Sequence, residues 1–70
     1  MTYEIAFIVI LDQENPLMPT RITHVKVNPS YKDIERLNEM SKAIDSENCK
    51  VINLTWSDFL RLKTFMDKAV

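Results

Sequence analysis

An unbroken apolar run over residues 5–11 limits the folds open to this 70-residue chain more than any other feature. These seven residues suit a β-strand, and they are far fewer than the roughly 20 that a membrane-spanning helix needs. Alternate side chains of a strand point to opposite faces. Here one face carries Ile5, Phe7, Val9 and Leu11, and the other carries Ala6, Ile8 and Ile10. Both faces must leave water, so we expect the chain's own helices to cover one face and a partner to cover the other.

Length and composition indicate one small domain over residues 1–70, near the lower size limit for an independent core. The apolar fraction of 46% and the charged fraction of 27% are ordinary for a folded protein, so an intrinsically disordered chain is not expected. The net charge of -1 gives no overall field toward nucleic acid or membranes. Residues 21–32 nevertheless contain Arg21, Lys26 and Lys32 and no acid, which predicts a local basic patch.

The chain contains no glycine. This excludes phosphate-binding loops, dinucleotide-binding fingerprints, nucleophile elbows and EF-hand loops, because each of these motifs requires glycine at fixed positions. Turns must instead use Pro, Asn, Asp or Ser. We therefore expect Asn48 to take the left-handed conformation that ends the first helix.

Cysteine usage and the N-terminal residues indicate a cytoplasmic protein. Cys49 is the single cysteine, so an intrachain disulfide is excluded, as is usual in a reducing compartment. No basic leader precedes the apolar run, and a signal peptide is not expected. If the chain is viral, the expected compartment is the host cytoplasm.

The pattern of apolar residues predicts strands at residues 3–11, 21–27 and 49–55 and helices at residues 31–44 and 57–68. Ser30 with Asp33 resembles a capping box at the start of the first helix. The fold class is therefore α+β with order ββαβα. Because the most apolar strand belongs in the middle, we predict a three-stranded sheet ordered 2-1-3, with both helices packed on one face. In the second strand, one face is expected to carry Thr23, Val25 and Val27, and the other Ile22, His24 and Lys26.

No residues suggest catalysis or a bound cofactor. His24 is the only histidine, and a general base requires a nucleophile or an orienting acid beside it. In the 2-1-3 order, the central strand separates His24 from Cys49, which argues against a Cys–His pair. One histidine and one cysteine also cannot close a zinc site. We expect no enzyme activity, no cofactor and no metal.

The loop between the first two strands is the first candidate binding site. Leu17 and Met18 lie between Pro16 and Pro19, so they form a stiff apolar tip that fits a partner's pocket. The alternative is that the tip folds back over its own sheet. Trp56 could likewise be an interface anchor or a core residue, and we favour a place in the core.

Two further surfaces are candidates for partner binding. The smaller side chains of the second sheet face, Ala6, Ile8 and Ile10, suit contact with a second copy of the chain or with another protein, and a dimer is expected. The second strand offers an alternative site around Arg21, His24 and Lys26. Nucleic acid is a weaker alternative, because the open face of the first strand is aliphatic and the sequence pI is about 5.7.

These observations predict a small, non-enzymatic protein–protein interaction module that acts by steric binding. In its size, compactness and lack of catalytic motifs, the chain resembles the small accessory proteins that bacteriophages use to bind and inhibit host or defence proteins. That resemblance implies an inhibitor with a protein partner. The alternatives are a self-assembling structural subunit and a nucleic-acid-binding regulator.

Overall fold

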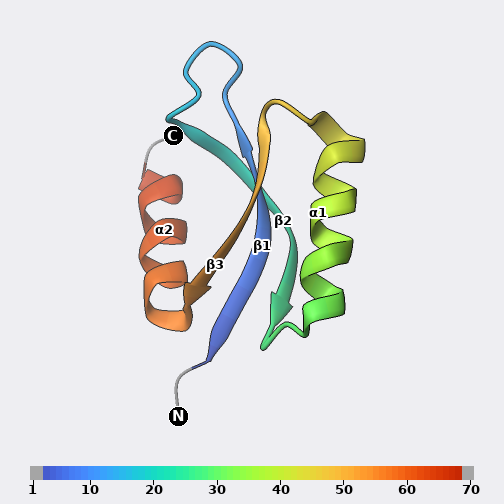
Figure 1. Cartoon of the computed structure of the whole chain (residues 1–70). Coiled ribbons are helices and arrows are strands. Elements are labelled where there is room, and N and C mark those ends of the chain that lie inside the picture. The colour runs from blue at the N-terminus through green and yellow to red at the C-terminus, as the bar shows by residue number, and fades with distance from the viewer. Residues whose placement is uncertain (1–2, 69–70) are drawn as a thin grey trace.

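The computed structural model describes residues 3–68. Its elements are β1 (Glu4–Leu11), β2 (Pro19–Val27), α1 (Tyr31–Asp45), β3 (Cys49–Thr55) and α2 (Trp56–Lys68). The three strands form one antiparallel sheet in the order β2-β1-β3. The α+β class, the ββαβα order and the 2-1-3 sheet are therefore confirmed (Figure 1).

The two helices lie on opposite faces of the sheet, so the prediction that both pack on one face is wrong (Figure 1). Phe59 of α2 packs against the face that carries Ile5, Phe7 and Val9. Leu37 of α1 packs against the face that carries Ala6 and Ile8. The physical reason is that both faces of β1 are apolar, and the chain supplies one helix for each of them. The expectation that a chain of this size leaves its second face open is wrong for the same reason.

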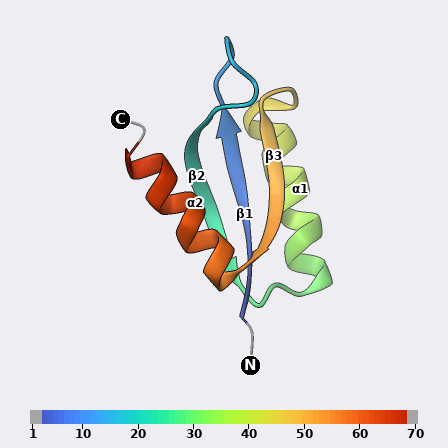
Figure 2. The ribbon, with the colours of Figure 1, turned by 90° about the vertical axis from the view of Figure 1, so that its left-hand side faces the viewer.

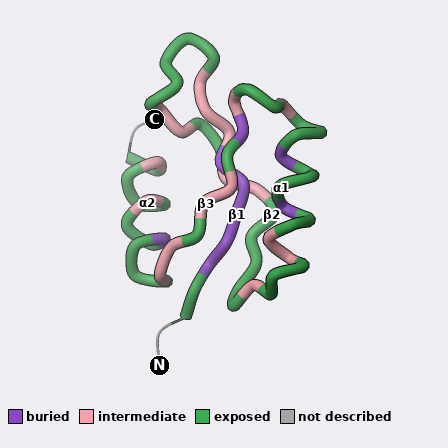
Figure 3. The backbone as a smooth tube through the Cα atoms, in the orientation of Figure 1, coloured by how far each residue is buried: buried purple, intermediate pink, exposed green. Residues whose placement is uncertain are grey.

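The core is centred on β1 (Figure 3). Residues 5–9 expose at most 1% of their surface. Each fully buried Ile, Val or Phe side chain stabilises the fold by about 1.5–3 kcal/mol relative to an exposed one. Because β1 is the centre of the sheet and is covered on both faces, it is not available to a partner.

Side-chain hydrogen bonds fix both ends of α1. At the start, the Asp33 amide donates to Ser30 Oγ at 3.2 Å and the Ser30 amide donates to Asp33 Oδ2 at 3.0 Å, which confirms the capping box. At the end, Asp45 Oδ1 accepts from the amides of Glu47 at 2.9 Å and Asn48 at 3.2 Å. Asn48 is not left-handed, because the Asp45 carboxylate satisfies the turn's N–H groups instead.

A β-bulge in β2 rearranges the faces of that strand. Ala6 pairs with Lys26 but Ile8 pairs with Thr23, so β2 contains one extra residue opposite Phe7. The backbone of His24 has a φ of 55°, in the left-handed region that glycine usually occupies.

This bulge makes the predicted division of β2 side chains wrong, because an extra residue reverses the alternation beyond it. The strand register and the close-up view show the polar residues gathered on the α1 side and the apolar ones on the α2 side. The α1 side carries Arg21, Thr23, His24 and Lys26, and the α2 side carries Ile22, Val25 and Val27.

Helix α2 starts directly after β3, where Thr55 Oγ1 accepts a hydrogen bond from the Asp58 amide at 3.3 Å. The helix then crosses the sheet obliquely, and its last turns lie beside the beginning of β2 (Figure 2). The later part of β2 therefore stays partly uncovered, with Val25 46% and Val27 56% exposed. Among residues 3–68, no helix is long and apolar enough to cross a membrane.

Candidate interaction surface

An apolar patch lies at the end of β2, on the α2 side of the sheet. Tyr3, Val27 and Trp56 line a shallow depression there and are 51%, 56% and 45% exposed. We call these three residues the apolar patch. Val25 lies on the same side of β2 and extends the uncovered apolar surface. Contiguous exposed apolar surface of this kind is typical of sites that contact other proteins.

Hydrogen bonds of the flanking segments hold the apolar patch in place. The Trp56 amide donates to the Tyr3 carbonyl at 2.9 Å, which joins the start of α2 to the chain before β1. On the other side, the Asn28 amide donates to the Glu4 carbonyl at 2.7 Å, and the Glu4 amide donates to Asn28 Oδ1 at 3.2 Å. The patch is therefore preorganised, which lowers the entropy cost of binding.

Trp56 is a patch residue rather than a core residue, so the favoured core assignment is wrong. The rings of Trp56 and Phe59 have centroids 6.0 Å apart and planes inclined by 36°, and 45% of Trp56 is exposed. The reason is its position at the first residue of α2, where the helix has not yet passed over the sheet. Trp is enriched at protein interfaces and among the residues that carry their binding energy, so a half-exposed Trp56 is a candidate interface anchor.

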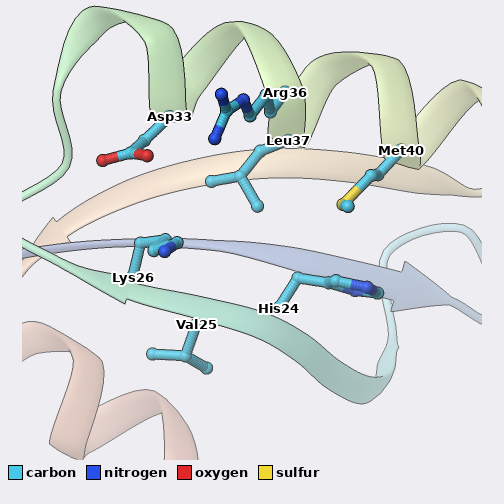
Figure 4. A pocket seen from close by; sticks show the side chains of 7 residues that line it. All are labelled: His24, Val25, Lys26, Asp33, Arg36, Leu37 and Met40. Carbon is cyan, nitrogen blue, oxygen red and sulfur yellow. The ribbon is translucent and has the colours of Figure 1, made fainter.

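A second surface lies on the opposite side of β2, between that strand and α1. Its lining residues come from both elements and leave an open groove of about 240 Å³ (Figure 4). We call this the basic groove, and it is lined by His24, Val25, Lys26, Asp33, Arg36, Leu37 and Met40. His24 and Lys26 lie on the α1 side of the strand in the close-up, whereas the Val25 side chain points away from α1.

The predicted loop tip is exposed but lies far from the apolar patch. The loop joins the end of β1 to the start of β2, whereas the patch lies at the other ends of these strands (Figure 1). Leu17 is 92% exposed, while Met18 is partly buried. The Met18 amide donates to the Asn15 carbonyl at 2.9 Å, and its carbonyl accepts from the Asp12 amide at 2.9 Å. Only Leu17 therefore projects freely, and its role in binding stays a prediction.

The structure separates the remaining predicted contact residues. Ala6 and Ile8 are completely buried under α1 and Ile10 is partly buried, so they do not form an open face for a partner. Their assignment as accessible contacts is wrong because α1 covers them. Arg21, His24 and Lys26, by contrast, share one side of β2.

Sequence reasoning missed several residues of these surfaces, namely Tyr3, Val27, Arg36 and Met40. Met40 lies on α1 and is 44% exposed. No spacing rule places Arg36 beside Lys26, because their proximity depends on how α1 lies along β2. A cluster of exposed residues from distant segments has no signal in a single sequence.

The structure does not bring His24 and Cys49 together. His24 Nδ1 lies 3.1 Å from Thr23 Oγ1, while Cys49 is buried on β3, with β1 between the two strands. Within residues 3–68, no group of three His, Cys, Asp or Glu residues is arranged to hold a metal ion. No protein-family model, curated protein or solved structure matches the chain.

Proposed function

We propose that this chain is a small, non-enzymatic protein–protein interaction module that acts by steric binding. The observation that carries the proposal is the apolar patch of Tyr3, Val27 and Trp56, which stays about half exposed beside the edge strand β2. Tyr and Trp are among the residues that most often carry the binding energy of protein interfaces, and the burial of Val27 against a partner would add apolar contact. Inhibition of a host or defence protein by a phage accessory protein is one form that this steric action takes.

The apolar patch favours contact through side chains over addition of a strand to the sheet. β2 is an edge strand, but its bulge at His24 and its charged residues Arg21 and Lys26 disfavour pairing with another strand. The patch side chains lie next to this protected edge. A partner therefore gains most by packing a complementary apolar surface on Trp56 and Val27.

Self-assembly is the rival function, and it uses the same patch. A dimer through an open sheet face is no longer expected, because α1 covers that face. A symmetric contact of two apolar patches would still bury Trp56 from both copies. The two functions differ in whether the chain needs a second protein to cover the patch.

The test combines capture of a partner with the mass in solution. The tagged chain is used to capture proteins from a native lysate, beside the variants Val27→Lys and Trp56→Lys. Tyr31→Lys is the matched control, because Tyr31 is a 79% exposed aromatic residue at the start of α1. We expect one stoichiometric partner with the wild type and the control, and its loss with both patch variants.

Light scattering on the same proteins distinguishes self-assembly from binding to a different protein. Twice the monomer mass for the wild type, reduced to the monomer mass by Val27→Lys, would favour self-assembly. If neither patch variant differs from Tyr31→Lys in capture or in mass, the apolar patch is not the binding site.

A further inference from the structure

The basic groove combines positive charge with an apolar floor. Leu37 is 3% exposed and Met40 is 44% exposed, and both come from α1. Lys26 from β2 and Arg36 from α1 also line the groove (Figure 4). His24 lines the groove further along β2, and Arg21 lies beyond it on the same side of the strand.

The bulge in β2 is what concentrates these polar groups. With regular alternation, Thr23 and Arg21 would lie on the opposite side from Lys26. The extra residue brings all three to the α1 side, and His24 at the bulge contacts Thr23 at 3.1 Å. A left-handed residue other than glycine is costly, and such strain is characteristic of functional sites.

The one acid of the groove is engaged by the helix cap. Asp33 Oδ2 accepts from the Ser30 amide at 3.0 Å. This hydrogen bond and that of the Ser30 side chain lower the pKa of Asp33, and the charges of Lys26 and Arg36 lower it further. Asp33 is thus ionised at neutral pH, and its carboxylate is hydrogen-bonded to Ser30. Because Lys26 and Arg36 line the same groove, the net charge of its lining residues is positive.

We propose that the basic groove binds an acidic segment of a protein partner, with an apolar side chain on Leu37 and Met40 and carboxylates on Lys26 and Arg36. The inference deepens the proposed function and rests on it, because it names the chemistry of the partner. Charge complementarity selects an acidic segment. Arg36 suits this role because a guanidinium binds a carboxylate with two parallel hydrogen bonds.

The shape and lining of the groove favour a peptide over other ligands. Its volume of about 240 Å³ lies below the roughly 300–1,000 Å³ that is typical of small-molecule pockets. Nucleic acid is recognised by stacking on aromatic rings along a basic path, whereas the residues that line this groove include no Phe, Tyr or Trp ring. The apolar floor instead matches a Leu or similar side chain between acids.

The test measures fluorescence anisotropy with a labelled short peptide of Asp, Glu and Leu. A second peptide with Lys in place of the acids and a labelled single-stranded oligonucleotide are the comparison probes. The protein variants are Lys26→Glu, Arg36→Glu and Met40→Ala. The matched control is Lys42→Glu, which makes the same charge change on an exposed base in the last turn of α1.

We expect the acidic peptide to bind the wild type and Lys42→Glu alike. Lys26→Glu and Arg36→Glu should each weaken binding at least about tenfold, which equals about 1.4 kcal/mol. Met40→Ala should weaken binding without changing its dependence on salt, because it removes apolar contact only.

Three results would overturn the inference. These are equal weakening by Lys42→Glu and Arg36→Glu, no preference for the acidic over the basic peptide, and tighter binding of the oligonucleotide with the same sensitivity to Arg36→Glu.

The patch variant Val27→Lys separates this inference from the proposed function. It should leave peptide binding intact while partner capture is lost, and retained capture would contradict the proposed function alone.

Discussion

The rings of Phe7 and Phe59 lie with their centroids 5.1 Å apart and their planes inclined by 57°, which is a tilted aromatic pair between the central strand and α2. Phe7 is fully buried and Phe59 is 5% exposed. Tilted pairs at this distance stabilise a fold beyond the area that they bury. The pair helps to hold α2 on its face of the sheet, with Trp56 one turn earlier on the same helix.

Phe59→Ala should lower the free energy of unfolding by about 3–5 kcal/mol, because it removes a buried ring and leaves a cavity against Phe7. Urea unfolding followed by circular dichroism measures the loss. Phe65→Ala on the same helix is the control, since Phe65 is 54% exposed, and it should cost less than about 1 kcal/mol. Similar losses for the two variants would contradict the packing of α2.

Ile8→Lys should unfold the chain, because it places a charge in the fully buried layer between β1 and α1. Far-UV circular dichroism of the variant should lose its folded signal. Val25→Lys introduces the same charge at a 46% exposed position of the neighbouring strand and should stay folded. A folded Ile8→Lys protein would show that α1 does not cover this face.

His24→Gly should raise the free energy of unfolding by about 1 kcal/mol, because glycine takes a positive φ without the steric cost that a side chain adds. Val25→Gly, one position along the strand, should lower it instead. Thermal and urea unfolding measure both changes. Equal losses at the two positions would mean that the bulge carries no backbone strain.

Acid should destabilise both ends of α1. Hydrogen bonds from Ser30 lower the pKa of Asp33 below 3.8, and those from Glu47 and Asn48 do the same for Asp45. A lowered folded-state pKa gives stability that is present above the unfolded-state value and is lost as pH falls through the folded-state value. The melting temperature should therefore fall below about pH 4.

The variant Asp33→Asn, Asp45→Asn tests this dependence, since neither amide can ionise. Its melting temperature at pH 7 should be lower than that of the wild type, and its decrease between pH 5 and the acid limit should be smaller. Each single variant should give part of the effect. A decrease as steep as that of the wild type would assign the acid sensitivity to other carboxylates.

Leu17→Ala combined with Met18→Ala should weaken partner capture at least about tenfold, which is about 1.4 kcal/mol. The melting temperature should change little, because Leu17 is 92% exposed and makes almost no contact with the core. Pull-down titration and calorimetry measure the two effects. Unchanged capture with a clearly lower melting temperature would show that Met18 packs on its own sheet and does not bind the partner.

The elements and their order were predictable because they depend on local patterns. The run at residues 5–11 identified the central strand, and Ser30 with Asp33 identified the start of α1. The side of the sheet that each helix covers was not predictable in the same way. The apolar pattern of β1 is the same whether a helix or a partner covers its second face, so the sequence left that choice open.

The candidate surfaces were predicted only in part, because they depend on the bulge. The sequence does not indicate that the backbone of His24 is left-handed, because glycine usually occupies such positions and this chain has no glycine. The bulge reverses the alternation of β2 and so decides that Thr23 faces α1. Arg21 and Lys26 were recognised as one site, but their partner Arg36 depends on the path of α1.

The central position of β1 in the sheet also determines how long one edge of this strand stays unpaired while the chain is being synthesised. One edge of β1 pairs with β2, which follows closely, but its other edge pairs only with residues 49–55. Until those residues leave the ribosome, a seven-residue apolar segment keeps one open edge, which is the type of segment that joins others in cross-β aggregates. Late pairing of distant strands is also slow. Yield and aggregation during expression should therefore respond to changes in β3 as strongly as to changes in β1 itself.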